Sequence, residues 1–283
     1  MSRDPSTGRF RDRIKLQPTL IGMVHVRALP GTPHADSTVA EVVKHAATEA
    51  AHLQAAGFDA IIIENMHDRP YLRKTVGSEV VAAMTSVSVA VRQAVGPEFP
   101  VGIQILAGAN EAALAVAMAA GLDFIRAEGF VFASVADEGI LDEADAGPLL
   151  RYRRQIQAEH IDILADLKKK HSAHAITADV SWAETAHAME FFGADGVIVT
   201  GSATGMPTVP SDVQQVAEAT ALPILVGSGI QPETVPTLLA HGACGLIVGS
   251  ALKQGGHWAN ELDPDRVQAV VGAFRDSIAN RSA

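Results

Sequence analysis

The chain has 283 residues, of which 48% are hydrophobic and 5% aromatic, and its 22 Lys and Arg against 32 Asp and Glu give a formal charge of −10. This length suits one (β/α) barrel domain, and the acidic balance argues against a general nucleic-acid surface, which needs a basic face. A small anionic ligand stays compatible with it, because a pocket can be locally positive. The single cysteine, Cys244, allows no intrachain disulfide, and no apolar run approaches the ~20 residues that span a bilayer.

The first 17 residues carry five basic side chains with no apolar segment behind them, which is not typical of a secretory signal. We therefore expect a flexible N-terminal extension over residues 1–17, one domain over residues 18–283, and a cytoplasmic location. Peripheral membrane association is the less favoured alternative, because the extension shows no periodic apolar face.

Short apolar runs recur along the chain, and each is followed by a helical pattern. The predicted strands span residues 19–25, 60–64, 101–106, 124–127, 161–167, 196–200, 224–227 and 245–249. The predicted helices span residues 39–56, 79–95, 111–120, 148–160, 182–192, 212–220, 232–239 and 264–278. Eight β-then-α units predict an α/β protein with a single (β/α)8 TIM barrel. An open doubly wound sheet is the alternative, disfavoured because no Gly-x-Gly-x-x-Gly turn follows the first strand.

Two glycine–serine turns close the last two predicted strands, in the segments PILVGSG (223–229) and GLIVGSA (245–251). Turns with little side-chain bulk expose backbone N–H groups, and the loops after strands seven and eight of such barrels commonly bind phosphate. We therefore predict a phosphorylated small-molecule ligand, bound through backbone groups of Gly227, Ser228, Gly229, Gly249 and Ser250.

Polar residues gather at the carboxyl ends of the other predicted strands, where a closed barrel would turn them towards one pocket. Glu64 or Asp166 is the predicted general base, and Lys168 is predicted to stabilise a developing anion. The predicted substrate-binding residues are His25, Asn65, Gln104, Arg126, Thr200, Ser202 and Thr204. The loop that contains the last three is predicted to be a flap over the pocket, or else a plain surface connection.

Three adjacent lysines, at 168–170, favour electrostatic binding of an anion over imine chemistry, because an imine-forming amine needs desolvation. The spacing of Glu64, His67 and Asp68 does not match a strong metal-ligand signature. The metal question therefore stays open, with Mg²⁺ as the first candidate if phosphate and carboxylates share the site. Exposed apolar faces on barrel helices also predict a homo-oligomer.

Ordered motifs from residue 19 to the end resemble those of the BtpA/SgcQ family: IGMVH (21–25), LPGTP (29–33), IENMHD (63–68), DLKKKH (166–171), TGSATG (200–205), VGSG (226–229) and IVGSALK (247–253). The resemblance implies a barrel related to the ribulose-phosphate-binding group. It implies either an enzyme, since some members sit among sugar-uptake and sugar-metabolism genes, or a biogenesis factor for a membrane complex, since one member acts in photosystem I accumulation. For an enzyme, the residues fit an isomerase, an epimerase or a carbon–carbon lyase that acts on a sugar phosphate or a nucleoside-derived phosphate. This chain departs from the commonest opening by Arg27, which would add positive charge near the pocket mouth.

Overall fold

Eight parallel strands close into a barrel. The computed structural model describes residues 9–201 and 206–282. The barrel strands are β1 (Thr19–His25), β2 (Ala60–Glu64), β3 (Val101–Gln104), β4 (Phe124–Ala127), β7 (Asp162–Leu167), β9 (Gly196–Thr200), β10 (Ile224–Gly227) and β11 (Gly245–Val248). Each strand pairs with the next in this order, and β11 pairs in parallel with β1. This closure confirms the predicted TIM barrel and is incompatible with an open doubly wound sheet.

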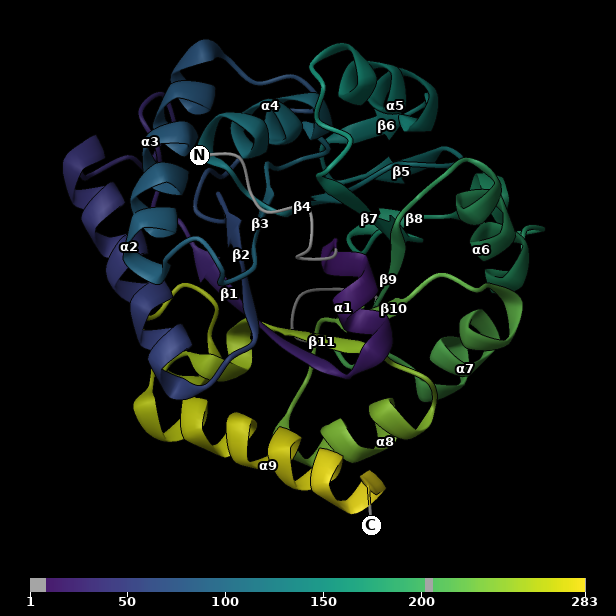
Figure 1. Cartoon of the computed structure of the whole chain (residues 1–283). Helices are drawn as coiled ribbons and strands as arrows, with labels where there is room; N and C mark the ends of the chain where they lie inside the picture. The colour runs from purple at the N-terminus through teal and green to yellow at the C-terminus, as the bar shows by residue number, and fades with distance from the viewer. Residues whose placement is uncertain (1–8, 202–205, 283) are drawn as a thin grey trace.

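Helices surround the barrel between successive strands (Figure 1). They are α2 (Val39–Ala56), α3 (Ser78–Val95), α4 (Asn110–Ala120), α5 (Ala146–Gln155), α6 (Trp182–Phe191), α7 (Pro210–Ala219), α8 (Val235–Ala240) and α9 (Pro264–Ser282), with short 3₁₀ turns η1 (Ala175–Thr177), η2 (Pro232–Thr234), η3 (Ser250–Leu252) and η4 (Gln254–Gly256). Capping boxes begin α2 at Thr38 and α6 at Ser181, and left-handed glycines end α2 and α4. Over residues 9–201 and 206–282, no helix combines the length and apolar character that a membrane crossing requires.

A small antiparallel sheet, which the sequence pattern did not predict, lies in the loops that follow β4 and β7. Its strands are β5 (Ser134–Ala136), β6 (Gly139–Leu141) and β8 (Ser172–Ala173), in the order β6-β5-β8. Because β8 follows the lysine run at 168–170 after only one residue, this sheet ties down the segment that carries the three lysines.

Alternate residues of each strand point into the barrel and stack in layers. The lower layers are an apolar cluster that includes Ile21, Met23, Ala60, Ile62, Phe124, Leu164, Ile198, Leu225 and Ile247. Continuing the same alternation to the carboxyl ends gives the upper layer: His25, Glu64, Gln104, Arg126, Asp166, Thr200, Gly227 and Gly249. The barrel therefore has an apolar floor and a polar mouth, with two glycines in the mouth layer where the other strands carry polar side chains.

Residues 10–16, expected to belong to a flexible extension, form helix α1 (Phe10–Leu16) instead. Figure 1 shows α1 inside the ring of strands. Phe10 and Ile14, one helical turn apart, are buried in the apolar cluster, and the Phe10 ring stacks on Phe124 at 4.3 Å between centroids. Arg9 and Arg11 form ion pairs with the buried carboxylates of Asp162 and Asp195. The segment thus plugs the end of the barrel opposite the polar mouth.

Candidate active site at the barrel mouth

A cavity of about 100 Å³ opens at the polar mouth. It brings together predicted residues from five strand ends and the turns that follow them: His25, Glu64, Arg126, Ser228, Gly229, Gly249 and Ser250. Lys170, Met66, Gln231 and Gly256 also line it, and none of them was among the predicted site residues. Both glycine–serine turns therefore face the same space as a carboxylate, an imidazole and two cations.

His25 is held as a neutral imidazole whose Nε2 accepts hydrogen bonds. Its Nδ1 lies 3.0 Å from the Trp258 carbonyl oxygen, which can only accept, so Nδ1 carries the proton. Burial, reinforced by the charge of Lys253, lowers the pKa of His25 to about 3. Its Nε2 lies 3.7 Å from Glu64 Oε2, at the cavity. The pair therefore offers a substrate hydroxyl one acceptor nitrogen beside one carboxyl group.

Glu64 has the properties of a general acid or base. The Glu64 side chain is buried and lines the cavity. Burial raises the pKa of its carboxyl group, although the charges of Lys170 and Arg126 oppose the shift. A carboxyl group whose pKa is moved towards neutrality can both take and return a proton in one catalytic cycle.

Arg126 and Asp166 form a buried bidentate ion pair. Arg126 Nε and Nη2 donate to the two carboxylate oxygens of Asp166 at 2.8 and 2.9 Å. Burial by itself lowers the pKa of Arg126, but the charge and hydrogen bonds of Asp166 outweigh it and raise the pKa above its ordinary value. Because both Asp166 oxygens are engaged, Asp166 orients Arg126, and Glu64 is the better candidate for the base.

The three adjacent lysines point to three different places. Lys168 Nζ donates to the Val180 carbonyl at 2.7 Å and lies 5.3 Å from the centre of the Trp182 ring, so it is not part of the mouth cavity. Lys169 Nζ lies 2.9 Å from Glu138 Oε2 and 3.5 Å from Glu128 Oε2. Lys168, predicted as the cation of the site, therefore does not line the mouth cavity, whereas Lys170 does.

Lys170 lines the mouth cavity, half-buried, beside Arg126 and Glu64. Burial, together with the positive charge of Arg126, lowers its pKa, against the carboxylates nearby. The sequence offered no signal for this choice, because a left-handed backbone at Lys168 (φ 53°) and His171 (φ 56°) decides which lysine turns inward.

Glu128 is a second buried carboxyl that the predicted site lacked. Burial is the main reason that its pKa is raised to about 7, although the charge of Lys169 opposes the shift. Its Oε2 has no hydrogen-bond partner within residues 9–201 and 206–282. It forms a separate cluster with Lys169 and Glu138.

Three further predicted residues lie at the strand ends without lining the mouth cavity. Asn65 accepts from the Leu106 backbone N–H at 2.8 Å and donates to Asp68 at 3.0 Å, so it holds neighbouring loops together. The Gln104 Oε1 and Thr200 Oγ1 atoms are buried and have no hydrogen-bond partner in the described part of the chain. Ser202 and Thr204 lie outside the described residues.

The first glycine–serine turn is shaped by its backbone. Ser228 and Gly229 both adopt left-handed conformations, with φ of 76° and 62°. Residues 206–208 pack directly on this turn: Ser228 Oγ donates to the Met206 carbonyl at 3.2 Å, and a Cβ on Gly229 would overlap that carbonyl. Thr208 Oγ1 donates to the Gly227 carbonyl at 2.9 Å. The segment that follows the predicted flap is therefore in contact with the candidate phosphate site.

The second turn packs against His25. A Cβ on Gly249 would lie 3.1 Å from His25 Nε2, so the absence of a side chain keeps this nitrogen accessible. The backbone N–H groups of Gly229, Gly249 and Ser250 donate to no acceptor in the described part of the protein. Such N–H groups, with no side chain in front of them, suit an anion. Among the described residues, no group of three or more His, Cys, Asp or Glu side chains could hold a metal ion.

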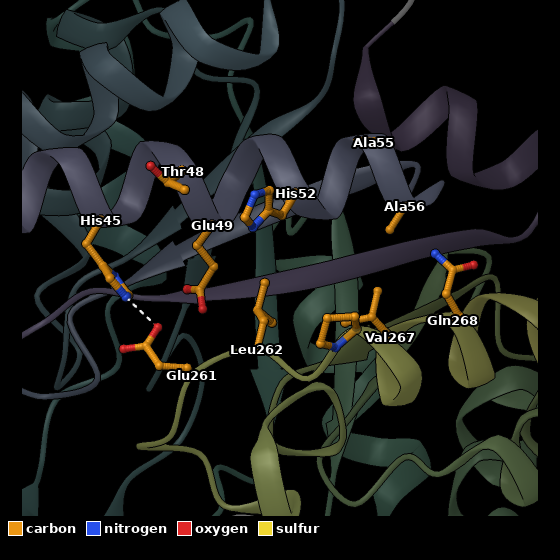
Figure 2. A pocket seen from close by; sticks show the side chains of 11 residues that line it. His45, Thr48, Glu49, His52, Ala55, Ala56, Glu261, Leu262, Val267 and Gln268 are labelled. Carbon is orange, nitrogen blue, oxygen red and sulfur yellow. Dashed lines mark hydrogen bonds and ion pairs between the residues drawn. The ribbon is translucent and has the colours of Figure 1, made fainter.

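A larger cavity, of about 560 Å³, lies outside the mouth between α2 and the segment 261–268 (Figure 2). His45 Nε2 lies 2.8 Å from Glu261 Oε2 on its wall, and the same Glu261 pairs with Arg27. Arg27, expected near the pocket mouth, therefore pairs with a wall residue of this groove and does not line the mouth cavity. Despite its size, the groove lacks the strand-end residues, and barrel enzymes work at the carboxyl ends of their strands. We therefore take the smaller cavity as the candidate active site.

Comparison with known proteins gives the family. The BtpA family matches over residues 16–276, so the chain belongs to this family. It is 48% identical over 259 residues to an uncharacterized mitochondrial protein of Caenorhabditis elegans, covering 90% of this chain and 92% of the relative. It is 34% identical over 263 residues to the photosystem I biogenesis protein BtpA of Synechocystis, covering 93% and 90%.

Solved structures share the fold at low sequence identity. The (S)-3-O-geranylgeranylglyceryl phosphate synthase of Thermoplasma acidophilum, solved with its substrate sn-glycerol 1-phosphate, superposes with a TM-score of 0.59. The match covers 94% of this chain and 96% of that enzyme at 16% identity. A likeness at this identity supports the barrel architecture alone.

Proposed function

Starting from membership of the BtpA family, we propose that this protein is an enzyme that acts on a small phosphorylated metabolite at the barrel mouth. The observation that carries the proposal is the convergence of both glycine–serine turns with Glu64, His25, Arg126 and Lys170 on one cavity. Backbone donors for an anion and an acid–base pair with a shifted pKa are the parts that such an enzyme requires.

The phosphate would bind to the backbone N–H groups of Gly229, Gly249 and Ser250, because these have no acceptor within the described protein. Arg126 and Lys170 add positive charge to the same cavity. The Thermoplasma acidophilum synthase, which has the same fold, was solved with sn-glycerol 1-phosphate, and barrels of this fold commonly bind phosphate after their last two strands, so a phosphorylated ligand is the class to test first.

Chemistry at the rest of the substrate would use Glu64 as the proton acceptor and His25 Nε2 as the acceptor of a hydroxyl hydrogen bond. Lys170, in place of Lys168, would stabilise the negative charge that develops when a proton leaves a carbon beside a carbonyl. Isomerisation, epimerisation and carbon–carbon lyase reactions share this step, so the proposal extends to all three. Mg²⁺ has no step in this scheme.

The name of the Synechocystis relative supports a second candidate, a biogenesis factor that uses the barrel as a binding module. The charged residues at the barrel mouth favour the enzyme over the biogenesis factor. A charge held partly or wholly out of water is costly without a partner or ligand, and the side chains of the buried Glu64 and the half-buried Lys170 form no hydrogen bond within the described residues. A scaffold would gain stability by replacing such groups with apolar ones.

A thermal-shift screen with phosphorylated sugars, nucleotides and inorganic phosphate tests the proposal. A ligand present at ~100 times its Kd adds about 2.7 kcal/mol to the free energy of unfolding. Ser250→Glu should abolish the shift by placing a negative charge in the turn, whereas Ser86→Glu, on the exposed face of α3, should keep it. Cooperative melting with no shift for any phosphate would refute the phosphate site.

A further inference from the structure

The lysine run ends in an amine whose surroundings differ from those of its neighbours. Lys168 is held by the Val180 carbonyl and the Trp182 ring, and Lys169 by Glu138 and Glu128. The amine of Lys170 has no hydrogen-bond or ion-pair partner in the described residues, and it lines the mouth cavity. An adjacent run of lysines suggested solvated charges, but the fold separates them.

The position of Lys170 suits a nucleophile. Its neighbours in the cavity are Arg126, whose charge disfavours a second cation, and Glu64, a carboxyl group within the same cavity. Lysines become nucleophilic at neutral pH when they are desolvated or lie beside another cationic group. The pKa of Lys170 is lowered by burial first and Arg126 second, while Glu64, Asp166 and Glu128 oppose the shift.

We propose that Lys170 forms an imine with the carbonyl carbon of a phosphorylated aldehyde or ketone bound at the mouth. This inference deepens the proposed function, on which it rests, by naming a carbonyl substrate class and a covalent intermediate.

The step balances with groups present in the cavity. The neutral amine attacks the carbonyl carbon, which forms a C–N bond and breaks the C–O π bond, and one proton passes from the nitrogen to the oxygen to give a neutral carbinolamine. A proton from the Glu64 carboxyl group then lets the hydroxyl leave as water, which breaks the C–O bond and gives the iminium ion. The carboxylate so formed can remove a proton from the adjacent carbon, and the iminium nitrogen receives the electron pair. Hydrolysis reverses the imine and restores the amine.

Glycolaldehyde phosphate is a suitable probe, because it is a small molecule that joins an aldehyde to a phosphate. The intact protein is mixed with this probe at neutral pH, sodium borohydride reduces any imine to a stable amine, and peptide mass spectrometry locates the label. We expect label on Lys170 in several-fold excess over the exposed Lys44. Glycolaldehyde without phosphate, at the same concentration, should label Lys170 much less.

Matched variants sharpen the result. Lys168→Ala should retain the label on residue 170, whereas Lys170→Arg, which keeps the positive charge, should lose it. The pH at half-maximal labelling should be lower for Lys170 than for Lys44, which a merely accessible amine would not show.

Failure of this inference can be told from failure of the proposed function. If inorganic phosphate or phosphorylated sugars raise the melting temperature but Lys170 is labelled no more than Lys44, the imine is refuted and the phosphate site stands. If no phosphorylated compound stabilises the protein and the phosphate group of the probe gives no advantage in labelling, the proposed function fails as well.

Discussion

Helix α1 should be a structural part of the barrel, and Phe10→Ala tests this directly. The Phe10 side chain is 4% exposed and stacks on Phe124 inside the barrel. Truncation of a buried phenylalanine to alanine costs about 3–5 kcal/mol. An unfolding entropy of about 2.1 cal/mol/K per residue gives about 0.6 kcal/mol/K over 283 residues, so the melting temperature should fall by about 5–8 °C.

The matched control is Leu16→Ala, at the other end of the same helix, where the side chain is 86% exposed. Differential scanning calorimetry of the two variants and the parent measures both changes under one condition. Leu16→Ala should leave the melting temperature within about 1 °C, since exposed substitutions change stability by ~0.5 kcal/mol or less. Equal melting of the two variants would show that α1 does not seal the barrel, and the segment would then be the flexible extension that its charges suggested.

Buried charges and the turns give three more expectations. Glu49→Gln leaves the buried Lys253 ammonium without its carboxylate partner, so urea unfolding should show that the free energy of unfolding falls by about 3–5 kcal/mol. The double variant Glu49→Gln with Lys253→Met should recover most of this loss. An unchanged urea midpoint for Glu49→Gln alone would show that the ion pair does not stabilise the fold. The raised pKa of Glu128, about 7 against an ordinary 4.5, means that the folded protein keeps a proton that the unfolded chain releases, so this contribution to stability is complete below pH 4.5 and is lost as the pH rises through 7. The free energy of unfolding of Glu128→Gln should therefore change less with pH between 4.5 and 7 than that of the parent. If the two curves run parallel, the pKa of Glu128 is not raised in the folded protein. Gly229→Ala should weaken phosphate affinity about tenfold or more, equivalent to ~1.4 kcal/mol, because the added Cβ would overlap the Met206 carbonyl. The control Gly96→Ala, also at positive φ but with no atom within 4 Å of the added Cβ, should leave the affinity unchanged. Isothermal titration calorimetry measures both affinities, and equal values would show that the turn is not part of the phosphate site.

The barrel itself was predictable because its signals are local. Five of the expected strands, at 19–25, 60–64, 124–127, 196–200 and 224–227, have the observed bounds, since continuous apolar runs between helical patterns identify buried parallel strands. Period-two alternation then carries His25, Glu64 and Arg126 to the mouth. The family resemblance was likewise confirmed by the match over residues 16–276.

The parts that sequence reasoning missed depend on three-dimensional contacts. The sequence could not rank Lys168 against Lys170, because backbone turns and the small sheet after β7 decide which amine faces inward. It assigned Asp166 as a possible base, but the partner that occupies both its oxygens, Arg126, is 40 residues away. It took residues 10–16 as part of a flexible extension, because the two residues that are buried there, Phe10 and Ile14, are too few for a periodic signal.

Closure of the barrel by its first and last strands has a consequence for biosynthesis. Thr19 of β1 aligns with Gly245 of β11, so one edge of β1 has no partner until β11 has been made, more than 200 residues later. During translation, that edge exposes unpaired backbone groups, which are a template for association with other chains. Release of the C-terminal segment from the ribosome is therefore the event that removes the last open edge. Premature termination before β11 would leave an open sheet with two unpaired edge strands. Such fragments would tend to associate with other chains, and they would need chaperones to prevent it.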